Sequence, residues 1–324
     1  MKFNSTKFVL ANTMMIGVIM TICSNNWVSM WMGLEVSLIS FIPFMQNNSM
    51  VYAESMIKYF IIQSVASTMF LFSVIILLVG ASMMNEMIMT IAMLIKIGSA
   101  PFHNWVMMII ENLSFYTMFT LLTVIKIPPL MVLYQTSTDL LNFPIMLSMI
   151  ISSIMSLNQN SIRKILGYSS IYNIATMLIL INKFNTLLVF LMIYSLPLIM
   201  IIKMTKTLKI NFINQMALNE FNSMIKINLW INMMSMSGFP PLMGFLGKII
   251  TIQVLMENVS YLTLTVLMLS SILVMMFYMR MIFTLMISVS MSKKWTLNKT
   301  NFSYETIPLN IFLTSSFISI SLIM

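Results

Sequence analysis

A long apolar segment of this chain is interrupted at residues 96–105 by the sequence Lys96-Ile97-Gly98-Ser99-Ala100-Pro101-Phe102-His103-Asn104-Trp105. Glycine and proline in the middle of a hydrophobic helix free backbone groups that would otherwise bond within the helix. At membrane depth, such freed groups are tolerated only where protein or water covers them. The interruption therefore predicts a broken helix beside a polar route, with Lys96 directly before the break.

A second apolar segment is interrupted in a similar way at residues 237–248, by Ser237-Gly238-Phe239-Pro240-Pro241-Leu242-Met243-Gly244-Phe245-Leu246-Gly247-Lys248. In membrane transporters, two interrupted helices at corresponding places in the two halves of a chain mark the ion site. We interpret the two interruptions, each of which carries one lysine, as parts of a proton path.

The composition is typical of an integral membrane protein. Of the 324 residues, 59% are hydrophobic and 8% are charged, whereas soluble domains carry roughly a quarter charged residues. The net charge is +9, and most of the lysines stand between apolar segments. Such a distribution encodes membrane topology rather than nucleic-acid binding. We expect a protein that works within the membrane and does not bind nucleic acid.

Cysteine and histidine are almost absent from the chain. It has one cysteine, Cys23, and one histidine, His103, which is too few for an iron–sulfur, haem or zinc site. The sequence also contains no glycine-rich nucleotide-binding loop of the common types. We therefore expect that this chain binds no metal or cofactor and carries no redox centre of its own.

Apolar runs that could cross about 30 Å of hydrocarbon number about eleven. Their approximate extents are 8–24, 27–46, 53–80, 84–111, 113–134, 139–157, 161–182, 184–203, 224–256, 259–290 and 306–324. Very short connections separate most of them, which predicts antiparallel neighbouring helices. The sequence thus predicts an all-α, polytopic protein that forms a single membrane domain over residues 1–324.

The charges between the spans predict an orientation. If the N-terminus faces the compartment of synthesis, that side receives Lys2, Lys7, Arg163, Lys164, Lys203, Lys206, Lys209, Lys226, Lys293, Lys294 and Lys299. The opposite side receives Glu86, Asp139, Glu257 and Lys183. This asymmetry follows the positive-inside rule, and the loss of one span would scramble it.

Charged residues within the spans are the candidate functional residues, since each costs on the order of 3 kcal/mol at the centre of a membrane helix. They are Glu35 in the second span, Lys96 in the fourth, Lys126 in the fifth and Lys248 in the ninth. His103 could relay protons next to the first break, or it could bind carbonyls that the break has freed. The four charged residues, in turn, could conduct protons or could only hold helices together.

Three other charged residues fit local roles. Glu54 and Lys58 are four residues apart at the start of the third span, which predicts an ion pair along one helix. Arg280 lies near the loop end of the tenth span, where a long side chain is expected to reach the membrane surface.

Five motifs of the chain resemble, in the same order, those of the mitochondrial NADH dehydrogenase subunit 2 family. They are WMGLE at 31–35, AESMIKYF at 53–60, APFHNW at 100–105, LNQNSIRKILGYSS at 157–170 and GFPPLMGFLGK at 238–248. The resemblance covers nearly the whole chain to about Phe283. Members of this family are antiporter-like subunits in the membrane arm of respiratory complex I, in the mitochondrial inner membrane.

This resemblance implies two inverted five-helix repeats, at about 8–134 and 139–290, each with a broken fourth helix, followed by an extra helix at about 306–324. It implies that Glu35 pairs with Lys96 and that Lys126 and Lys248 continue a polar axis. The partners would be other complex I subunits and membrane lipids, with NADH, FMN, iron–sulfur clusters and ubiquinone bound elsewhere in the complex. The N-terminus would face the matrix.

The chain departs from the family pattern at several positions. Asn173 stands where the family has a histidine, and Gly247-Lys248-Ile249 stands where the family has Pro-Lys-Trp. The amide of Asn173 can still hydrogen-bond to a chain of water molecules. Three functions remain open from the sequence: a proton-translocating subunit of complex I, a stand-alone cation/proton antiporter, and a structural membrane subunit.

Overall fold

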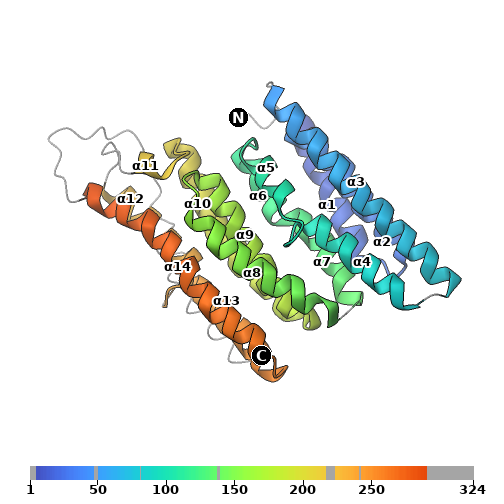
Figure 1. The fold of residues 1–324 in the computed structure, drawn as a ribbon. Helices are drawn as coiled ribbons and strands as arrows, with labels where there is room; N and C mark the ends of the chain where they lie inside the picture. Colours follow the sequence, from blue (N-terminus) through green and yellow to red (C-terminus); the bar gives the residue numbers. More distant parts are fainter. Residues whose placement is uncertain are drawn as a thin grey trace. The chain divides into compact units, whose positions relative to one another are not determined.

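The structure is a computed structural model, and it describes residues 5–46, 50–80, 82–136, 139–216, 223–240 and 242–289. Within these ranges the chain is helical, with one isolated β-bridge between Ser161 and Phe212 (Figure 1). Seven of the described helical segments are long and apolar enough to cross a membrane. The protein is therefore an all-α, multi-pass membrane protein. It divides into two compact units, Met1–Ser148 and Met149–Met324.

The first unit is built from helices that follow one another with short connections. They are α1 (Ser5–Cys23), α2 (Trp27–Met45), α3 (Met50–Val79), α4 (Ser82–Ile97), α5 (Asn104–Ile110), α6 (Phe115–Leu122), the short 3-10 helix η1 (Val124–Lys126), α7 (Ile127–Thr136), η2 (Asp139–Leu141) and the first part of α8 (Asn142–Leu157). Figure 1 shows α1, α2 and α3 side by side, and the contacts of α2 with both neighbours agree.

Close contact between α1 and α2 depends on two glycines. A Cβ atom on Gly17 would lie 2.9 Å from the carbonyl oxygen of Gly33, and one on Gly33 would lie 2.9 Å from the carbonyl oxygen of Gly17. Small residues let membrane helices approach to backbone contact. This contact positions the part of α2 that carries Glu35, two residues after Gly33.

One face of α3 is buried along its length and packs against α2 and α4. The buried residues recur every three or four positions, as expected for one face of a helix; they include Ser55, Tyr59, Gln63, Ala66, Phe70 and Ser73. The opposite face exposes large apolar side chains such as Phe72 and Leu78, which suits contact with lipid. This arrangement places Tyr59 and Gln63 against the first broken helix.

The predicted break in the fourth span is confirmed. Helix α4 ends at Ile97 and α5 begins at Asn104. Gly98 takes a positive φ of 76°, which glycine adopts at little cost, and the amide of Ser99 donates to the carbonyl of Leu94 at 3.2 Å. This is the hydrogen-bond pattern of a glycine-terminated helix.

The predicted break in the ninth span is confirmed as well, and it ends in the same way. Helix α12 (Ser223–Ser237) stops before Gly238, and α13 (Met243–Glu257) begins five residues later. Gly238 has a φ of 70°, and the amide of Phe239 donates to the carbonyl of Met234 at 3.2 Å. The two breaks therefore share their local geometry although their sequences differ.

The fifth span is not the continuous helix over 113–134 that its hydropathy predicts. The span consists of α6, the 3-10 turn η1 and α7. The α-helix stops before Thr123, and Lys126 is the last residue of η1. Pro128 and Pro129 follow directly and cannot donate backbone hydrogen bonds to residues one turn earlier. The resulting irregular turn lies at the position of Lys126.

The second unit consists of the rest of α8 and the helices that follow it. These are α9 (Ile162–Ile179), η3 (Leu180–Asn182), α10 (Phe184–Leu208), α11 (Ile213–Met216), α12, α13 and α14 (Tyr261–Val289). Arg280 on α14 donates to the carbonyls of Leu157 and Gln159, so it binds the C-terminal end of α8 as well as lying near a loop. The predicted final span at 306–324 lies outside the described residues.

Candidate functional site

The five candidate residues lie within helices, at helix ends or directly beside a break. Glu35 lies within α2, Lys96 in the last turn of α4, His103 directly before α5, Lys126 at the end of η1, and Lys248 in the second turn of α13. Lys96, Lys126 and His103 are buried, while Glu35 and Lys248 are half-buried. The first four belong to the first unit and Lys248 to the second.

Glu35 and Lys96 lie within electrostatic range of each other. No hydrogen bond reaches Oε1 of Glu35 from any residue that the structure describes, although this oxygen is inaccessible to solvent. The carboxylate and the ammonium therefore interact through space, without a direct ion pair. Because the two charged groups are not bonded to each other, the strength of their interaction changes as either side chain moves.

Tyr59 on α3 is a third member of this group, and its position there is not evident from the sequence. Its side chain is 1% exposed and lies within electrostatic range of Glu35. Its ring contacts those of Phe41 and Trp105, with centroids 5.1 Å and 5.9 Å away. Tyr59 thus connects the carboxylate on α2 with the second half of the first broken helix. The motif AESMIKYF contained it, but only tertiary packing shows what it faces.

Two side chains bind carbonyls at the C-terminal end of α4. Nε2 of Gln63 donates to the carbonyl of Lys96 at 3.2 Å, and Nε1 of Trp105 donates to the carbonyl of Ile95 at 3.1 Å. The last carbonyls of a helix have no partner within the helix, and leaving them unpaired in a buried place is costly. Gln63 and Trp105 therefore stabilise the break and fix the backbone that carries Lys96.

At the second break, the lysine itself binds the free carbonyl. Nζ of Lys248 donates to the carbonyl of Ser237, the last residue of α12, at 2.6 Å. A Cβ atom on Gly238 would lie 3.0 Å from this Nζ and 2.5 Å from Cε. Gly238 therefore leaves the space in which the lysine side chain lies. The positive charge also lies at the negative end of the α12 dipole, where it is favoured.

Lys126 is an enclosed charged group of the first unit. It is 4% exposed, and its Nζ has no hydrogen-bond partner in the part of the chain that the structure describes. The turn η1 contacts α1 and α4, and α7 contacts α1, α2 and α4. The helices that carry Glu35 and Lys96 thus pack against the segment that carries Lys126. A buried ammonium in such a place is costly, which is unexpected for a residue whose only task is packing.

His103 follows the first break and interacts with the backbone of Pro101. It lies directly before α5, whose first helical residue is Asn104. This interaction agrees with the alternative in which the histidine binds backbone that the break has freed. A relay role for His103 stays a prediction.

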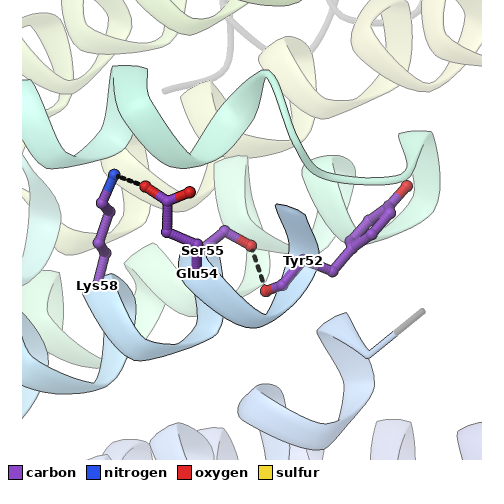
Figure 2. Close-up of polar contacts among 4 residues, drawn as sticks. All are labelled: Tyr52, Glu54, Ser55 and Lys58. Carbon is purple, nitrogen blue, oxygen red and sulfur yellow. Dashed lines mark hydrogen bonds and ion pairs between the residues drawn. The ribbon is translucent and has the colours of Figure 1, made fainter. Parts of the chain in front are cut away.

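Glu54 and Lys58 form the ion pair that their spacing predicts, which is thus confirmed, with Nζ 2.5 Å from Oε1 (Figure 2). In the same turn, the hydroxyl of Ser55 donates to the carbonyl of Tyr52 at 2.8 Å. The side chains of Lys58 and Glu54 are 42% and 61% exposed. These contacts are local to the start of α3 and separate from the buried group around Glu35.

Among the described residues, no three histidine, cysteine or acidic side chains are grouped so that they could hold a metal ion. The chemistry that the buried charges can support is the binding and release of protons. Carboxylate and amine groups change charge as they do so, and neighbouring charges then feel the change.

Sequence comparisons find relatives that match most of the chain. The sequence profile of the family described as NADH:quinone oxidoreductase/Mrp antiporter, TM, matches residues 24–276. The NADH-ubiquinone oxidoreductase chain 2 of Anopheles gambiae is 35% identical over 316 residues, which are 94% of this chain and 92% of that protein. The protein of the same name from Locusta migratoria is 34% identical over 304 residues, covering 90% of this chain and 89% of its own length.

Solved structures share the fold at lower identity. A chain of respiratory complex I from Thermus thermophilus superposes with a TM-score of 0.81 at 16% identity, covering 97% of this chain and 78% of that one. A chain of the Mrp complex from Dietzia superposes with a TM-score of 0.73 at 14% identity, over 88% of this chain and 60% of that one. Similarity at this level of identity concerns the fold alone.

Proposed function

Because this chain belongs to the NADH:quinone oxidoreductase/Mrp antiporter family of membrane proteins, we propose that its buried charges conduct protons through the membrane arm of respiratory complex I. The chain is a core membrane subunit of the proton-translocating NADH:ubiquinone oxidoreductase, and the other subunits of that complex are its partners. The electron-transfer cofactors belong to partner subunits; we propose that these are FMN and iron–sulfur clusters, with NADH and ubiquinone reacting there.

The observation that carries this proposal is the position of the lysines at the breaks. Lys96 lies in the last turn of the first half of one broken helix, and Lys248 binds the free carbonyl at the other break. Buried charges within membrane segments are costly, and they are typical of ion and proton routes. Two such lysines, a buried Lys126 and a nearby carboxylate exceed what helix packing alone requires.

A mechanism follows from the charges. In a low-dielectric site, burial disfavours the charged form of a lysine and a nearby carboxylate favours it. A change in the separation of Glu35 and Lys96 would therefore change whether Lys96 holds a proton. Protonated lysines repel one another, so a proton gained at one site favours release from the next.

The energy for this cycle has to come from outside the chain. Moving one charge across a membrane costs about 2.3 kcal/mol per 100 mV. Electron transfer in partner subunits releases energy, and conformational or electrostatic coupling would bring it to Glu35 and Lys96. We propose that this coupling acts first on these two residues, and that Lys126 and Lys248 are later members of the path.

The repeat architecture is part of the proposal. We propose about eleven membrane helices, with inverted repeats at about 8–134 and 139–290 and an extra helix at about 306–324. Support comes from the common geometry of the two breaks, each of which ends at a glycine with positive φ. The division of the chain into two compact units also suits a structure of two repeats.

Location and orientation are proposed on the same basis. We propose that the protein lies in the mitochondrial inner membrane with its N-terminus on the matrix side. Lys183 and Glu257, which the predicted topology places on one side, form an ion pair. On the other predicted side, Lys7 donates to the carbonyl of Gln46, and Arg163 donates to the side chain of Asn211. These contacts support the predicted alternation of the spans.

The likeness to a chain of the Mrp complex, at 14% identity, concerns the fold alone and does not favour a stand-alone cation/proton antiporter. Purification tests the assignment to complex I: a complex I subunit will copurify with flavin and iron–sulfur proteins, whereas an independent antiporter will not. A purely structural role within the complex is tested by substitution.

Substitution of Lys248 tests proton conduction directly. The intact complex with Lys248→Met, reconstituted into liposomes, is expected to assemble and to lose most of its proton pumping, since methionine fills a similar volume without a proton site. Lys183→Met, which removes a lysine at an exposed ion pair, is the control and is expected to pump normally. Full pumping by the Lys248→Met complex would overturn the proposed path.

A further inference from the structure

Two connections of the second unit pair with each other through their backbones. One leads from α8 to α9, and the other leads from α10 to α11. The amide of Ile162 donates to the carbonyl of Asn211 at 3.0 Å, and the bond in the other direction, from the amide of Ile213 to the carbonyl of Asn160, has the same length. The start of α9 and the end of α10 therefore lie side by side.

Side chains hold this paired structure at further points. Arg280 on α14 donates to the carbonyls of Leu157 and Gln159, which lie at the connection from α8 to α9. Nη2 of Arg163 lies 3.5 Å from Oδ1 of Asn211 on the other connection. The backbone that carries the charged side chains at this end of the unit is thus fixed by contacts with three helices.

The charge at this end of the second unit is strongly positive. The stretches 157–164 and 203–213 contain five basic residues and no acidic residue. The basic residues are Arg163, Lys164, Lys203, Lys206 and Lys209. Lys203, in the last turns of α10, and Lys209, directly after that helix, are both exposed. These two side chains are therefore available to an anion.

The carboxylate that the structure describes in the second unit lies at the opposite end of α10. It is Glu257, which forms an ion pair with Lys183, the residue before the helix begins. Lys209 follows the last residue of the same helix, which has 25 residues and is therefore about 37 Å long. Glu257 consequently does not neutralise the basic residues around Lys209.

An exposed apolar face of α10 ends at these lysines. Leu188, Met192 and Ile199 are exposed, and Lys203 follows Ile199 by four residues. Residues at such spacings lie on one face of a helix. This face is thus apolar along the middle of the membrane span and cationic at its end.

Basic residues at span ends also set membrane topology. That role requires positive charge on one side of the membrane and no particular position for each side chain. Lys209, however, has a φ of 54°, in a left-handed conformation for which glycine is usual at the end of a helix. A lysine held in this conformation, on a backbone fixed by its neighbours, favours a binding role.

We propose that this end of the second unit binds an anionic phospholipid, with the phosphate among Arg163, Lys203 and Lys209 and an acyl chain along the exposed face of α10. Arginine and lysine form strong charge-assisted hydrogen bonds with phosphate, and basic residues beside a membrane span attract anionic lipids. An acidic segment of a partner protein would meet the cations but leave the apolar face uncovered. The proposal does not depend on proton conduction.

Photo-crosslinking in the intact complex tests the proposal. The probes are phosphatidylglycerol and phosphatidylcholine that carry a diazirine in the acyl chain, and mass spectrometry identifies the labelled peptides. We expect phosphatidylglycerol to label residues 184–208 more strongly than phosphatidylcholine does. In Lys203→Gln with Lys209→Gln, this labelling is expected to fall about tenfold or more, because each lysine near an anionic surface contributes roughly fivefold.

The matched control is Lys7→Gln with Lys58→Gln, which removes the same charge near the ends of two spans in the first unit. It is expected to leave the labelling of α10 unchanged. Equal labelling of α10 by the two lipids would overturn the proposal, and so would unchanged labelling in the Lys203 and Lys209 variant.

Competition in the unsubstituted complex gives a second test, which decides the matter if the double variant fails to assemble. Unlabelled phosphatidylglycerol is expected to displace its photoactivatable form from α10, whereas phosphatidylcholine and inorganic phosphate are not. Equal displacement by phosphatidylcholine would mean that the charge of the lipid is not recognised. Displacement by inorganic phosphate at the same concentration would mean that the acyl chain is not. Either result would contradict a phospholipid site.

Discussion

The ammonium of Lys248 and the carbonyl of Ser237 form a 2.6 Å hydrogen bond across the second break. The bond joins the second half of the broken helix to the last residue of the first half. It satisfies a carbonyl that has no partner within α12, and it favours a charged lysine at that point because the C-terminal end of a helix is negative. Loss of the proton from Lys248 would weaken this bond, so protonation of the lysine and the geometry of the break are coupled.

Gly238→Ala is expected to displace Lys248 from Ser237. The added Cβ would lie 2.5 Å from Cε of the lysine, at a residue with a φ of 70°, so the side chain has to move. We expect an assembled complex with slower proton pumping. Proton uptake by proteoliposomes and the amount of assembled complex measure the two effects.

Gly80→Ala is the matched control for this substitution. Gly80 also has a left-handed backbone, with a φ of 94°, but a Cβ there would meet no atom within 4 Å. Both variants carry the backbone cost of about 1–2 kcal/mol for an L-residue in this region. Equal pumping by the two variants would show that the contact with Lys248 has no functional effect.

Glu35→Gln is expected to slow coupled turnover while assembly survives. The substitution keeps the size of the side chain and removes the negative charge that interacts with Lys96. Without that charge, the ammonium form of a buried lysine is less favoured. Movement of residue 35 then no longer changes whether Lys96 holds a proton. NADH-driven proton uptake in the assembled complex is the measurement, with Glu54→Gln at an exposed ion pair as the control. Normal coupling in Glu35→Gln would contradict a role for the pair.

Trp105→Phe is expected to loosen the first break. It removes the N–H that binds the carbonyl of Ile95 while it keeps an aromatic ring against Tyr59. The carbonyl of Ile95 then keeps only the bond from the amide of Gly98, at 3.2 Å, and the loss of one hydrogen bond costs about 0.5–1.5 kcal/mol. Faster amide hydrogen exchange at Gly98 and Ser99, whose amides bond to Leu94, is the expected result. Unchanged exchange there would mean that Trp105 does not stabilise the end of α4.

The two breaks were predictable from sequence because glycine and proline act locally on the backbone. Gly98 and Gly238 adopt the left-handed conformation that only glycine adopts easily. The interruption at Lys126 was missed, although Pro128 and Pro129 are its local signal. The run around them is apolar, so hydropathy alone indicates one continuous span there.

The supporting contacts were not predictable from sequence. Gln63 and Trp105 bind carbonyls of α4 from 33 and 10 residues away, and such pairings depend on how α3 and α5 pack. The same is true of Tyr59 beside Glu35, and of Arg280, which binds carbonyls at the end of α8. Charge and hydropathy indicated which residues are buried, while the packing of helices determines what each of them faces.

Substitution of Lys126 tests directly whether the buried charges conduct protons. Lys126 is enclosed, and no described residue accepts a hydrogen bond from its Nζ, so a structural ion pair is not what holds it there. Lys126→Met is expected to assemble and to stop proton transfer, because methionine is similar in size but has no proton site. Lys126→Arg is expected to impair transfer too, since a guanidinium stays protonated and cannot release its proton in each cycle.

The decisive measurement is proton uptake by liposomes that contain the intact complex with Lys126→Met or Lys126→Arg, scored together with the amount of assembled complex. If Lys126 conducts protons, both substitutions will give normal assembly and lost or impaired pumping. A structural lysine would give the reverse order, since arginine would preserve charge and assembly whereas methionine would cost about 3–5 kcal/mol of stability by leaving a buried partner unpaired. Full pumping with arginine and failed assembly with methionine would contradict the proton path.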